Sequence, residues 1–336
     1  MKFLIIRLSS LGDVIHSLPL VNALRKNFPD AQVDWLTGKK GYEVLSLISE
    51  INKVYLASLQ SLQSIQKQNY DYVIDVQGLF KSAFLAKLAS GKKIIGFKNT
   101  REFADIFYDE KINVGSLFDT KNHIVDLNLK LISNLLKNNN EKVKFLIPKI
   151  QSPDKNELIE NTKLKKIAVF PATTWKSKLW PMGYWYELIK KLSEKFYVYV
   201  CAAGSDLNCT GELIKNLDLN NIPYKNLVGK TNIKDLIYLV QNVDLVIGLD
   251  SAALHLAGAL KNDYGKPDVI GIYGPTSVYR NGPYNLTADA LSLTELDCIS
   301  CRKKLCPLGH HMCMNNLLPE YVIERIYSKS ENRVLC

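Results

Sequence analysis

The chain has 336 residues, 47% of them hydrophobic and 23% charged. This length and composition predict about two globular domains and exclude a disordered or fibrous chain. Lysine and arginine outnumber aspartate and glutamate by 43 to 33, and the resulting charge of +10 fits an anionic partner such as nucleic acid, a phosphate-bearing ligand or an acidic membrane surface.

The first half alternates short apolar runs, typical of buried strands, with amphipathic stretches typical of helices. Such alternation predicts parallel βαβ units with helices on both faces of the sheet. The expected strands cover residues 3–6, 33–36, 72–76 and 93–96, and the expected helices cover 14–28, 42–48 and 80–88.

A polar stretch over 148–164, which includes Lys155 and Asn156, predicts a linker, and the asparagine run 138–140 predicts a loop or helix end. We therefore expect an N-terminal domain over 1–150, a second α/β domain over 165–315 and a terminal segment over 316–336. The expected strands of the second half cover 167–170, 197–201, 245–247 and 269–273, and its helices cover 184–192, 233–240, 254–260 and 319–327.

The turn after the first strand carries two serines, a glycine and a carboxylate: Ser9, Ser10, Gly12 and Asp13. Ligands of open parallel sheets bind beyond the carboxyl ends of the strands, so this turn is a candidate site. Asp13 could equally be an ordinary carboxylate in the first turn of a helix, facing its dipole. The dinucleotide-binding spacing Gly-x-Gly-x-x-Gly is absent, which weakens a nicotinamide-cofactor interpretation.

Two segments of the second half have the composition of diphosphate-binding turns. The first follows the strand 167–170 and contains Thr173, Thr174 and Lys178, whose hydroxyls and ammonium suit phosphate oxygens, although they could simply be solvated.

The second segment follows the strand 245–247 and places an Asp-Ser pair and small residues at the start of a helix. Small residues let an anion approach a helix N-terminus, so this segment could bind a phosphate. In the structural interpretation, the Asp-Ser pair only caps the helix and the histidine only packs in the core. The candidate residues are Asp250, Ser251, Ala252, Ala253 and His255.

Together these motifs resemble the lipopolysaccharide core heptosyltransferases of glycosyltransferase family 9, in order and spacing as far as about Tyr273. The similarity is closest to the heptosyltransferase I branch. It rests on Arg-x-Ser-Ser-Leu-Gly-Asp-Val-Ile-His-x-Leu-Pro at 7–19, Asp34-Trp35, Asp-Val-Gln-Gly-Leu-Phe-Lys-Ser-Ala at 75–83, Arg101-Glu102-x-Ala104-x-x-x-Tyr108, Ala-Thr-Thr at 172–174 with Lys178-x-Trp180-Pro181, and Asp250-Ser251-x-x-x-His255-Leu256.

The resemblance implies an inverting transferase of the GT-B type, with two Rossmann-like domains that face each other across a cleft. The N-terminal domain would hold Kdo on lipid A, the C-terminal domain would hold ADP-heptose, and the last helix would pack back on the first domain. Asp13 would be the general base and ADP the leaving group, with no cofactor required. Heptosyltransferase II, or a GT-B enzyme with another acceptor or nucleotide sugar, is the alternative.

The candidate acceptor contacts are Ser9, Ser10, Gly12, Lys81, Arg101 and His123, with Lys121. For Lys81, Arg101, Lys121 and His123 the alternative is simple solvation at the surface.

Two features depart from the family pattern. Ala252 stands where the family usually has glycine, which leaves the form of that turn open. The acidic ribose contact would be Asp206 or Glu212, and the sequence does not decide between them.

A cysteine cluster lies beyond these motifs, at Cys298, Cys301, Cys306 and Cys313. Its first pair has the close spacing of zinc ligands, and His310 and His311 lie within the cluster, so structural zinc is one hypothesis. Reduced cysteines in a basic loop are the other.

The sequence also bears on location and partners. Arg7 interrupts the apolar start, and no apolar run approaches the roughly 20 residues of a membrane span. We expect a cytoplasmic protein, peripheral on the inner membrane and docking on its anionic surface through a basic face with Lys39, Lys40, Lys92, Lys93, Lys98 and Arg101. Nucleic-acid binding is a weaker alternative, because the charge is spread over both halves and no recognition motif is found.

Overall fold

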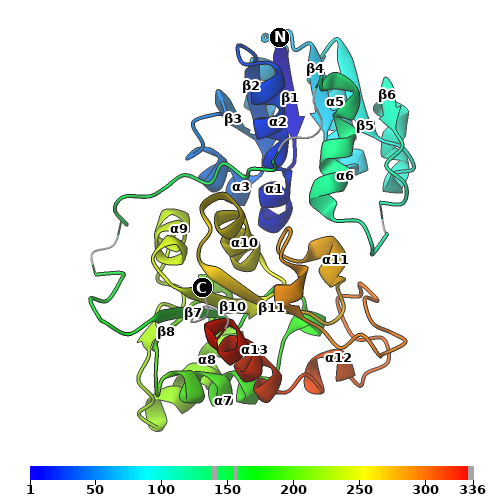
Figure 1. Cartoon of the computed structure of the whole chain (residues 1–336). Coiled ribbons are helices and arrows are strands. Elements are labelled where there is room, and N and C mark those ends of the chain that lie inside the picture. Colours follow the sequence, from blue (N-terminus) through cyan, green and yellow to red (C-terminus); the bar gives the residue numbers. More distant parts are fainter. Residues whose placement is uncertain (118, 138–141, 155–156, 332–336) are drawn as a thin grey trace. The chain divides into compact units, whose positions relative to one another are not determined.

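A computed structural model describes residues 1–117, 119–137, 142–154 and 157–331; the expected loop at 138–140 and the linker residues Lys155 and Asn156 lie outside them. The chain divides into two compact units, Met1–Pro148 and Lys149–Cys336. Each unit contains a six-stranded parallel sheet (Figure 1), so the predicted α/β class with two parallel-sheet domains is confirmed.

The sheet of the first domain has the strand order β3-β2-β1-β4-β5-β6, and every pairing is parallel. This is the order of a doubly wound Rossmann sheet, in which the strand order reverses between the first and fourth strands. The strands are β1 (Lys2–Ile6), β2 (Gln32–Thr37), β3 (Lys53–Leu56), β4 (Tyr72–Asp75), β5 (Lys93–Phe97) and β6 (Glu110–Ile112).

Helices cover both faces of this sheet, because α1, α2 and α6 contact one another while α4 contacts α5. The prediction of a single helix over 14–28 is wrong. Pro19 has no N–H to continue the first helix, so α1 ends at Ser17 and Pro19 begins α2. The helices are α1 (Leu11–Ser17), α2 (Pro19–Asn27), α3 (Lys39–Leu45), α4 (Leu59–Gln66), α5 (Phe80–Leu88) and α6 (Ile124–Leu131), with 3-10 turns η1 (Arg101–Phe107) and η2 (Ser133–Leu135).

The sheet of the second domain repeats the first, with the order β12-β11-β10-β7-β8-β9 and parallel pairing throughout. Its strand β10 is buried along its whole length, as expected for a central strand covered on both faces. The strands are β7 (Lys166–Phe170), β8 (Tyr197–Val200), β9 (Lys225–Asn226), β10 (Leu245–Leu249), β11 (Asp268–Ile272) and β12 (Ala290–Leu291).

The helices of the second domain form two groups: α7 contacts α8 and α13, while α9 contacts α10. They are α7 (Met182–Leu192), α8 (Leu207–Leu219), α9 (Ile233–Gln241), α10 (Ala252–Tyr264), α11 (Val278–Asn281), α12 (Met312–Asn315) and α13 (Pro319–Glu331), with η3 (Lys176–Lys178), η4 (Gly204–Asp206) and η5 (Thr287–Asp289). Within the described residues, no helix has the length and apolar character that crossing a bilayer requires.

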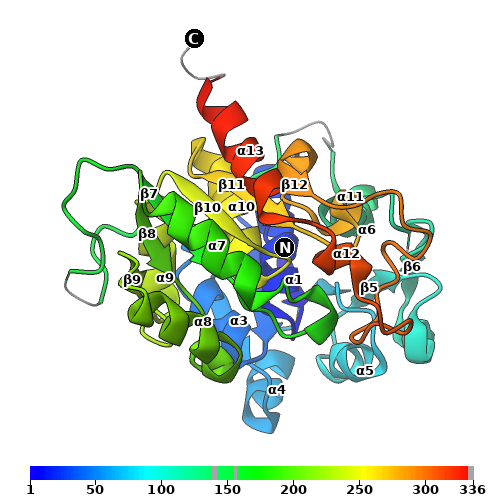
Figure 2. The same ribbon diagram turned by 90° about the horizontal axis from the view of Figure 1, so that it is seen from below.

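The last helix belongs to the core of the second domain. Val322 and Ile326 of α13 are buried in the same cluster as Trp185 and Leu188 of α7, and Figure 2 shows the two helices side by side. The expectation that this helix packs on the first domain stays a prediction.

Candidate active site

The candidate residues follow strands at the two points where the strand order reverses. In the first domain, the turn at 7–10 follows β1 and the segment 76–79 follows β4, and β1 pairs with β4. In the second domain, the loop at 171–178 follows β7 and Asp250 follows β10, and these strands also pair. Since each crevice at such a reversal is a ligand site in open α/β sheets, the topology supports one site in each domain.

Asp13 lies in the first turn of α1 and has two sets of partners. Its Oδ2 accepts hydrogen bonds from the Ser10 backbone N–H at 2.9 Å and from the Ser10 hydroxyl at 2.7 Å. Its Oδ1 lies 3.0 Å from Nη2 of Arg7, and a third of the side chain, 33%, remains exposed. Asp13 therefore does act as a capping carboxylate, and it also keeps accessible surface.

The charge state of Asp13 follows from these contacts. Desolvation would raise the pKa of its carboxyl, but the Arg7 guanidinium and the hydrogen bonds from Ser10 outweigh that effect and hold the pKa below its ordinary value. The group is ionised at neutral pH and can accept a proton from a nearby hydroxyl.

The segment after β4 holds the Asp13 turn in place. Arg7 Nη1 donates to the Val76 carbonyl at 2.7 Å, and Gln77 Oε1 accepts from the backbone N–H groups of Leu8 at 2.8 Å and Ser9 at 3.3 Å. Gly78 follows with φ of +67°, a left-handed conformation that favours glycine.

Asp75, at the end of β4, anchors that segment. It is fully buried and accepts hydrogen bonds from the Tyr108 hydroxyl at 2.7 Å, the Ser82 hydroxyl at 2.8 Å and the Gln77 backbone N–H at 2.9 Å. Burial nevertheless raises the pKa of the Asp75 carboxyl. These supporting roles of Arg7, Asp75 and Gln77 were not found by sequence reasoning, although all three lie in motifs that carry the family resemblance.

The other acceptor candidates have mixed environments. Lys81, Arg101 and Lys121 are exposed. His123 is buried and caps α6, with Nδ1 accepting from the Val125 N–H at 3.2 Å and its ring lying edge-on to His16. This part of the site therefore contains exposed cations, and His123 has a structural contact of its own.

In the second domain, the buried Asp250 contacts three of the other predicted donor residues, Thr173, Lys178 and His255. Lys178 Nζ lies 2.7 Å from Oδ2, His255 Nε2 lies 3.0 Å from Oδ1, and the Thr276 hydroxyl donates to Oδ2 at 2.6 Å. The Thr173 hydroxyl donates to the Asp250 carbonyl at 3.2 Å. Burial opposes ionisation, yet the hydrogen bond from His255 and the charge of Lys178 hold the pKa of Asp250 well below its ordinary value.

The N-terminus of α10 lies directly beyond Asp250. Ser251 is its N-cap residue, but the hydroxyl makes no capping bond and is buried without a hydrogen-bond partner among the described residues. Ala252 begins the helix and has no left-handed backbone conformation, so glycine is not needed there. The small side chains of Ala252 and Ala253 leave the first turn of a 13-residue helix accessible to an anion.

Three remaining candidates have no hydrogen bond or ion pair to Asp250 among the described contacts. Thr174 is exposed on the loop after β7. Asp206 ends η4 beyond β8 and is partly buried, while Glu212 is exposed on α8. Asp206 is nearer in sequence to the carboxyl end of β8, but the choice between the two for a ribose contact stays open.

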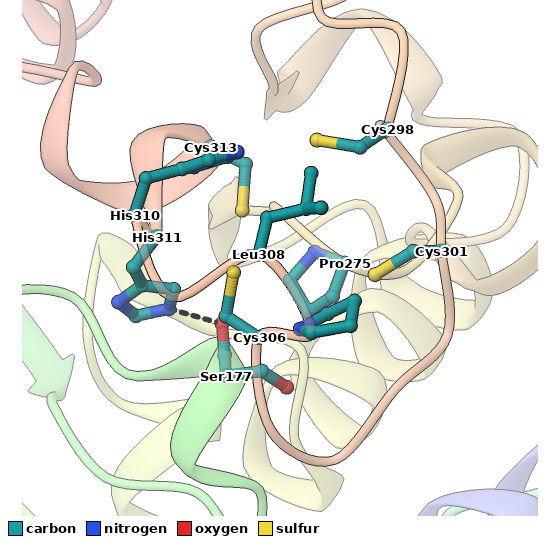
Figure 3. Close-up of a pocket in the computed structure, with 10 residues that line it drawn as sticks. Ser177, Pro275, Cys298, Cys301, Cys306, Leu308, His310, His311 and Cys313 are labelled. Atoms are coloured by element: carbon teal, nitrogen blue, oxygen red, sulfur yellow. Dashed lines mark hydrogen bonds between the residues drawn. The ribbon is translucent and has the colours of Figure 1, made fainter.

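The cysteine cluster lines one pocket with Ser177, Pro275 and His311 (Figure 3). The sulfurs of Cys306 and Cys313 point toward each other, and Leu308 projects into the same group. In the described part of the chain, no three His, Cys, Asp or Glu side chains are grouped so that they could hold a metal ion, and all four of these cysteines are free thiols. The structural-zinc hypothesis is therefore unsupported.

Residues 298–313, called here the cysteine segment, instead form hydrogen bonds to the turn that carries Lys178. The Ser177 backbone N–H donates to the Lys304 carbonyl at 3.1 Å, and the Ser177 hydroxyl donates to the Lys303 carbonyl at 2.6 Å. His311 Nε2 lies 2.5 Å from the Ser177 carbonyl oxygen, the contact drawn in Figure 3. The position of Lys178 beside Asp250 thus depends on residues more than 100 positions away in sequence.

Comparison with known proteins agrees with this geometry. Residues 59–312 match the model of glycosyltransferase family 9 (heptosyltransferase). The chain is 28% identical to lipooligosaccharide heptosyltransferase 2 of Campylobacter jejuni over 96% of each chain, and 29% identical to lipopolysaccharide heptosyltransferase 1 of Campylobacter coli over 84% of this chain and 86% of that protein.

Among solved structures, the Escherichia coli ADP-heptose lipopolysaccharide heptosyltransferase II superposes with a TM-score of 0.78, at 20% identity and 98% coverage of both chains. That likeness, with the two doubly wound sheets, corresponds to the GT-B architecture. Since the family model covers about three quarters of the sequence, the chain belongs to glycosyltransferase family 9, the heptosyltransferases.

Proposed function

We propose that the protein is a heptosyltransferase of lipopolysaccharide core biosynthesis that moves L-glycero-D-manno-heptose from ADP-heptose to the Kdo region of lipid A. The observation that carries the proposal is the Asp250 centre. A buried ionised carboxylate fixes Lys178 and Thr276 beside the N-terminus of α10, where the Ser251 hydroxyl has no partner among the described residues. Such a group of donors suits a nucleoside diphosphate.

In the proposed reaction, Asp13 removes the proton of the acceptor hydroxyl as that oxygen attacks the anomeric carbon of the heptose. The new C–O bond forms on the face opposite the leaving diphosphate, so the configuration inverts and one carboxylate is sufficient. Arg7 and Ser10 keep that carboxylate ionised and oriented, and its exposed third admits the acceptor.

The leaving group is ADP, whose terminal phosphate gains negative charge as the bond to the heptose breaks. The backbone N–H groups of the first turn of α10, the Ser251 and Thr173 hydroxyls and the Lys178 ammonium are the groups that would stabilise this charge. These donors are fixed before the reaction, because Asp250 and the cysteine segment already hold the Lys178 turn in place.

The acceptor step has two candidates. Relatives named heptosyltransferase 1 and heptosyltransferase 2 are similarly distant, at 29% and 28% identity. We favour transfer of the first heptose, to the Kdo region, because the segments at 75–83 and 101–108 resemble the heptosyltransferase I branch. The alternatives are transfer of the second heptose, as by heptosyltransferase II, or the use of another acceptor or sugar.

A donor and acceptor screen tests the proposal. Purified protein is given ADP-heptose, UDP-sugars or GDP-sugars together with Kdo-lipid A or with the same acceptor already carrying one heptose, and nucleotide release and product mass are measured. We expect ADP release with Kdo-lipid A. Transfer only to the heptosylated acceptor would establish the second step, and turnover only with UDP- or GDP-sugars would contradict the proposed donor.

The proposal places the enzyme on the cytoplasmic face of the inner membrane, where a lipid-anchored acceptor is made. The six basic residues expected to face the membrane are all exposed. Lys92 pairs with Asp71 at 2.8 Å and Lys93 with Glu110 at 2.5 Å, however, so this face attracts an anionic surface less than the number of cations suggests. The electrostatic attraction of this face therefore rests mainly on the other four exposed cations.

A further inference from the structure

Helix α5 of the first domain packs Leu85 and Leu88 against the core but turns two phenylalanines outward. It buries the small residues Ser82, Ala83 and Ala86, while Phe80 and Phe84 are 47% and 45% exposed. A surface helix of a globular protein normally buries its large apolar residues. The outer face of α5 therefore carries two aromatic rings that the described residues leave nearly half exposed.

The neighbouring η1 segment extends this surface. The Phe107 ring lies 5.4 Å from that of Phe80 and 6.1 Å from that of Phe84, each edge-to-face, and Phe80 and Phe84 stack at 6.4 Å. The same segment exposes Phe103 and Ile106, at 78% and 65%. We call these five residues the aromatic patch.

The backbone of η1 holds this arrangement at a cost. Glu102 and Phe103 have φ of +59° and +56°, a left-handed conformation that is unfavourable for residues with a Cβ. The Phe80 N–H donates to the Glu102 carboxylate at 3.2 Å, which ties the segment to the start of α5. A strained backbone that leaves a phenylalanine exposed is more typical of a functional surface than of a loop selected for stability.

The charges beside the patch indicate its partner. Lys81 and Lys87 lie on α5 and Arg101 begins η1, and all three are exposed. Of the acidic residues of η1, Asp105 lies 3.7 Å from the Lys111 ammonium, while Glu102 accepts from the neutral Phe80 N–H and keeps its negative charge. Three exposed cations therefore accompany one exposed carboxylate that has no cation partner among the described contacts. Exposed aromatic rings bordered by cations match a bilayer surface, where apolar side chains enter the acyl boundary and cations contact anionic headgroups.

We propose that the aromatic patch is the surface by which this protein attaches to an anionic phospholipid bilayer. The inference rests on the proposed function, since a lipid-anchored acceptor requires the enzyme to work at a membrane. The patch supplies the apolar contact that the basic residues alone do not provide. It would bring the first domain, which carries Asp13, to the surface in which the acceptor is embedded.

Vesicle flotation tests the attachment without donor or acceptor. The whole chain is mixed with vesicles of phosphatidylethanolamine and phosphatidylglycerol, or of phosphatidylcholine alone. We expect binding to the anionic vesicles that falls roughly tenfold or more in the double variant Phe84→Ser/Phe103→Ser, since each loses an inserting apolar side chain. Leu219→Ser is the matched control: Leu219 is 69% exposed at the end of α8 in the second domain, and its loss should leave binding unchanged.

A second measurement remains informative if the double variant folds poorly. In Phe103→Trp the new indole should be quenched by brominated phosphatidylglycerol, beyond any quenching of the four native tryptophans in the wild-type chain. No extra quenching, or equal flotation of the wild type and the double variant, would overturn the proposal. A patch-dependent shift from dimer to monomer without vesicle binding would assign the surface to a second copy of the chain.

The inference and the proposed function can fail separately. Transfer to a deacylated, water-soluble Kdo saccharide tests the chemistry without a bilayer, and the double variant should retain wild-type turnover there while losing turnover on vesicle-embedded acceptor. Vesicle binding without transfer to either acceptor would contradict the function alone. Transfer to both acceptors by both proteins alike would contradict the attachment alone.

Discussion

The Lys178 ammonium lies 2.7 Å from a carboxylate oxygen of Asp250, 72 residues away in sequence. Both side chains are largely buried, so each charge has lost much of its hydration and depends on the other. The pair joins the loop after β7 to the end of β10, and it therefore fixes the geometry of the candidate donor site before any ligand binds.

Replacing Lys178 by methionine should lower the free energy of unfolding by about 3 kcal/mol, because Asp250 would stay buried without its cation. It should also weaken ADP binding, which calorimetry can measure alongside urea unfolding. Lys176→Met is the control, since Lys176 is exposed in the same turn. Equal stability and ADP affinity for the two variants would contradict this assignment.

Acid should remove the stabilising effect of the Asp250 carboxylate. Its folded-state pKa lies below the ordinary 3.8, so its ionised form stabilises the fold above that pH, and the contribution is lost as pH falls toward the folded-state value. The difference in unfolding free energy between wild type and Asp250→Asn should be constant from neutral pH to about pH 4 and shrink below it. Urea titrations at several pH values measure this, and a difference that shrinks already near neutral pH would refute it.

Two hydroxyls near Asp250 should respond differently to removal. Ser251→Ala should change stability by less than about 0.5 kcal/mol, because its hydroxyl makes no bond in the described structure, but should weaken ADP binding roughly three- to tenfold. Thr276→Val should cost about 1–3 kcal/mol of stability, because its hydroxyl donates to buried Asp250. Unchanged ADP affinity in Ser251→Ala would exclude that hydroxyl from the ligand site.

Asp13→Asn should retain the fold and ADP affinity, because Asp13 lies in the other domain from the donor site, but turnover should fall by about 10²–10⁴-fold. Steady-state kinetics with a confirmed acceptor measures the loss. Ser10→Ala is the comparison: it removes one hydrogen bond to the carboxylate and leaves Arg7 in place, so it should lower turnover much less. Near-wild-type turnover of Asp13→Asn would remove it from the mechanism.

The four clustered cysteines should differ in reactivity. Backbone N–H groups of the following turn, that of His311 foremost, hold the pKa of Cys306 below the ordinary 9.0, whereas burial, followed by the neighbouring cysteines, raises the pKa of Cys313 to about 11. Iodoacetamide should therefore label Cys306 well before Cys313 at neutral pH. Peptide mass spectrometry over a pH series measures this, with Cys306→Ser as control, and equal rates would contradict it.

The sequence predicted the parts of the site that are local. A buried strand followed by Asp250 and Ser251 predicts the candidate donor turn, and the turn after the first strand predicts the candidate position of Asp13. Thr276 was missed because it follows β11, and its contact with Asp250 depends on which strands are neighbours in the sheet. Strand order is set by packing and cannot be derived from one sequence.

The helices and strands that the sequence mispredicts also have physical explanations. The apolar spacing predicts one helix over 14–28 because it continues past Pro19. The proline lacks the N–H that would continue the first helix, and this effect outweighs the spacing. The strand β3 and helix α4 were missed because their exposed positions, including Leu56 and Leu59, obscure the apolar periodicity. The hydrogen bonds from Ser177 to the backbone carbonyls of Lys303 and Lys304 could not be predicted, because every residue has a carbonyl and the side chains carry no signal for the contact.

The two sheets have the same strand order, and each carries its candidate residues at its own reversal point. Under the proposed function, donor choice and acceptor choice are encoded in separate compact units. A lineage of enzymes with this arrangement would change the sugar it delivers by altering the loops after β7 and β10, while the loops after β1 and β4 would keep the same acceptor. Under the proposed function, new glycan linkages can therefore arise by recombination between the two compact units.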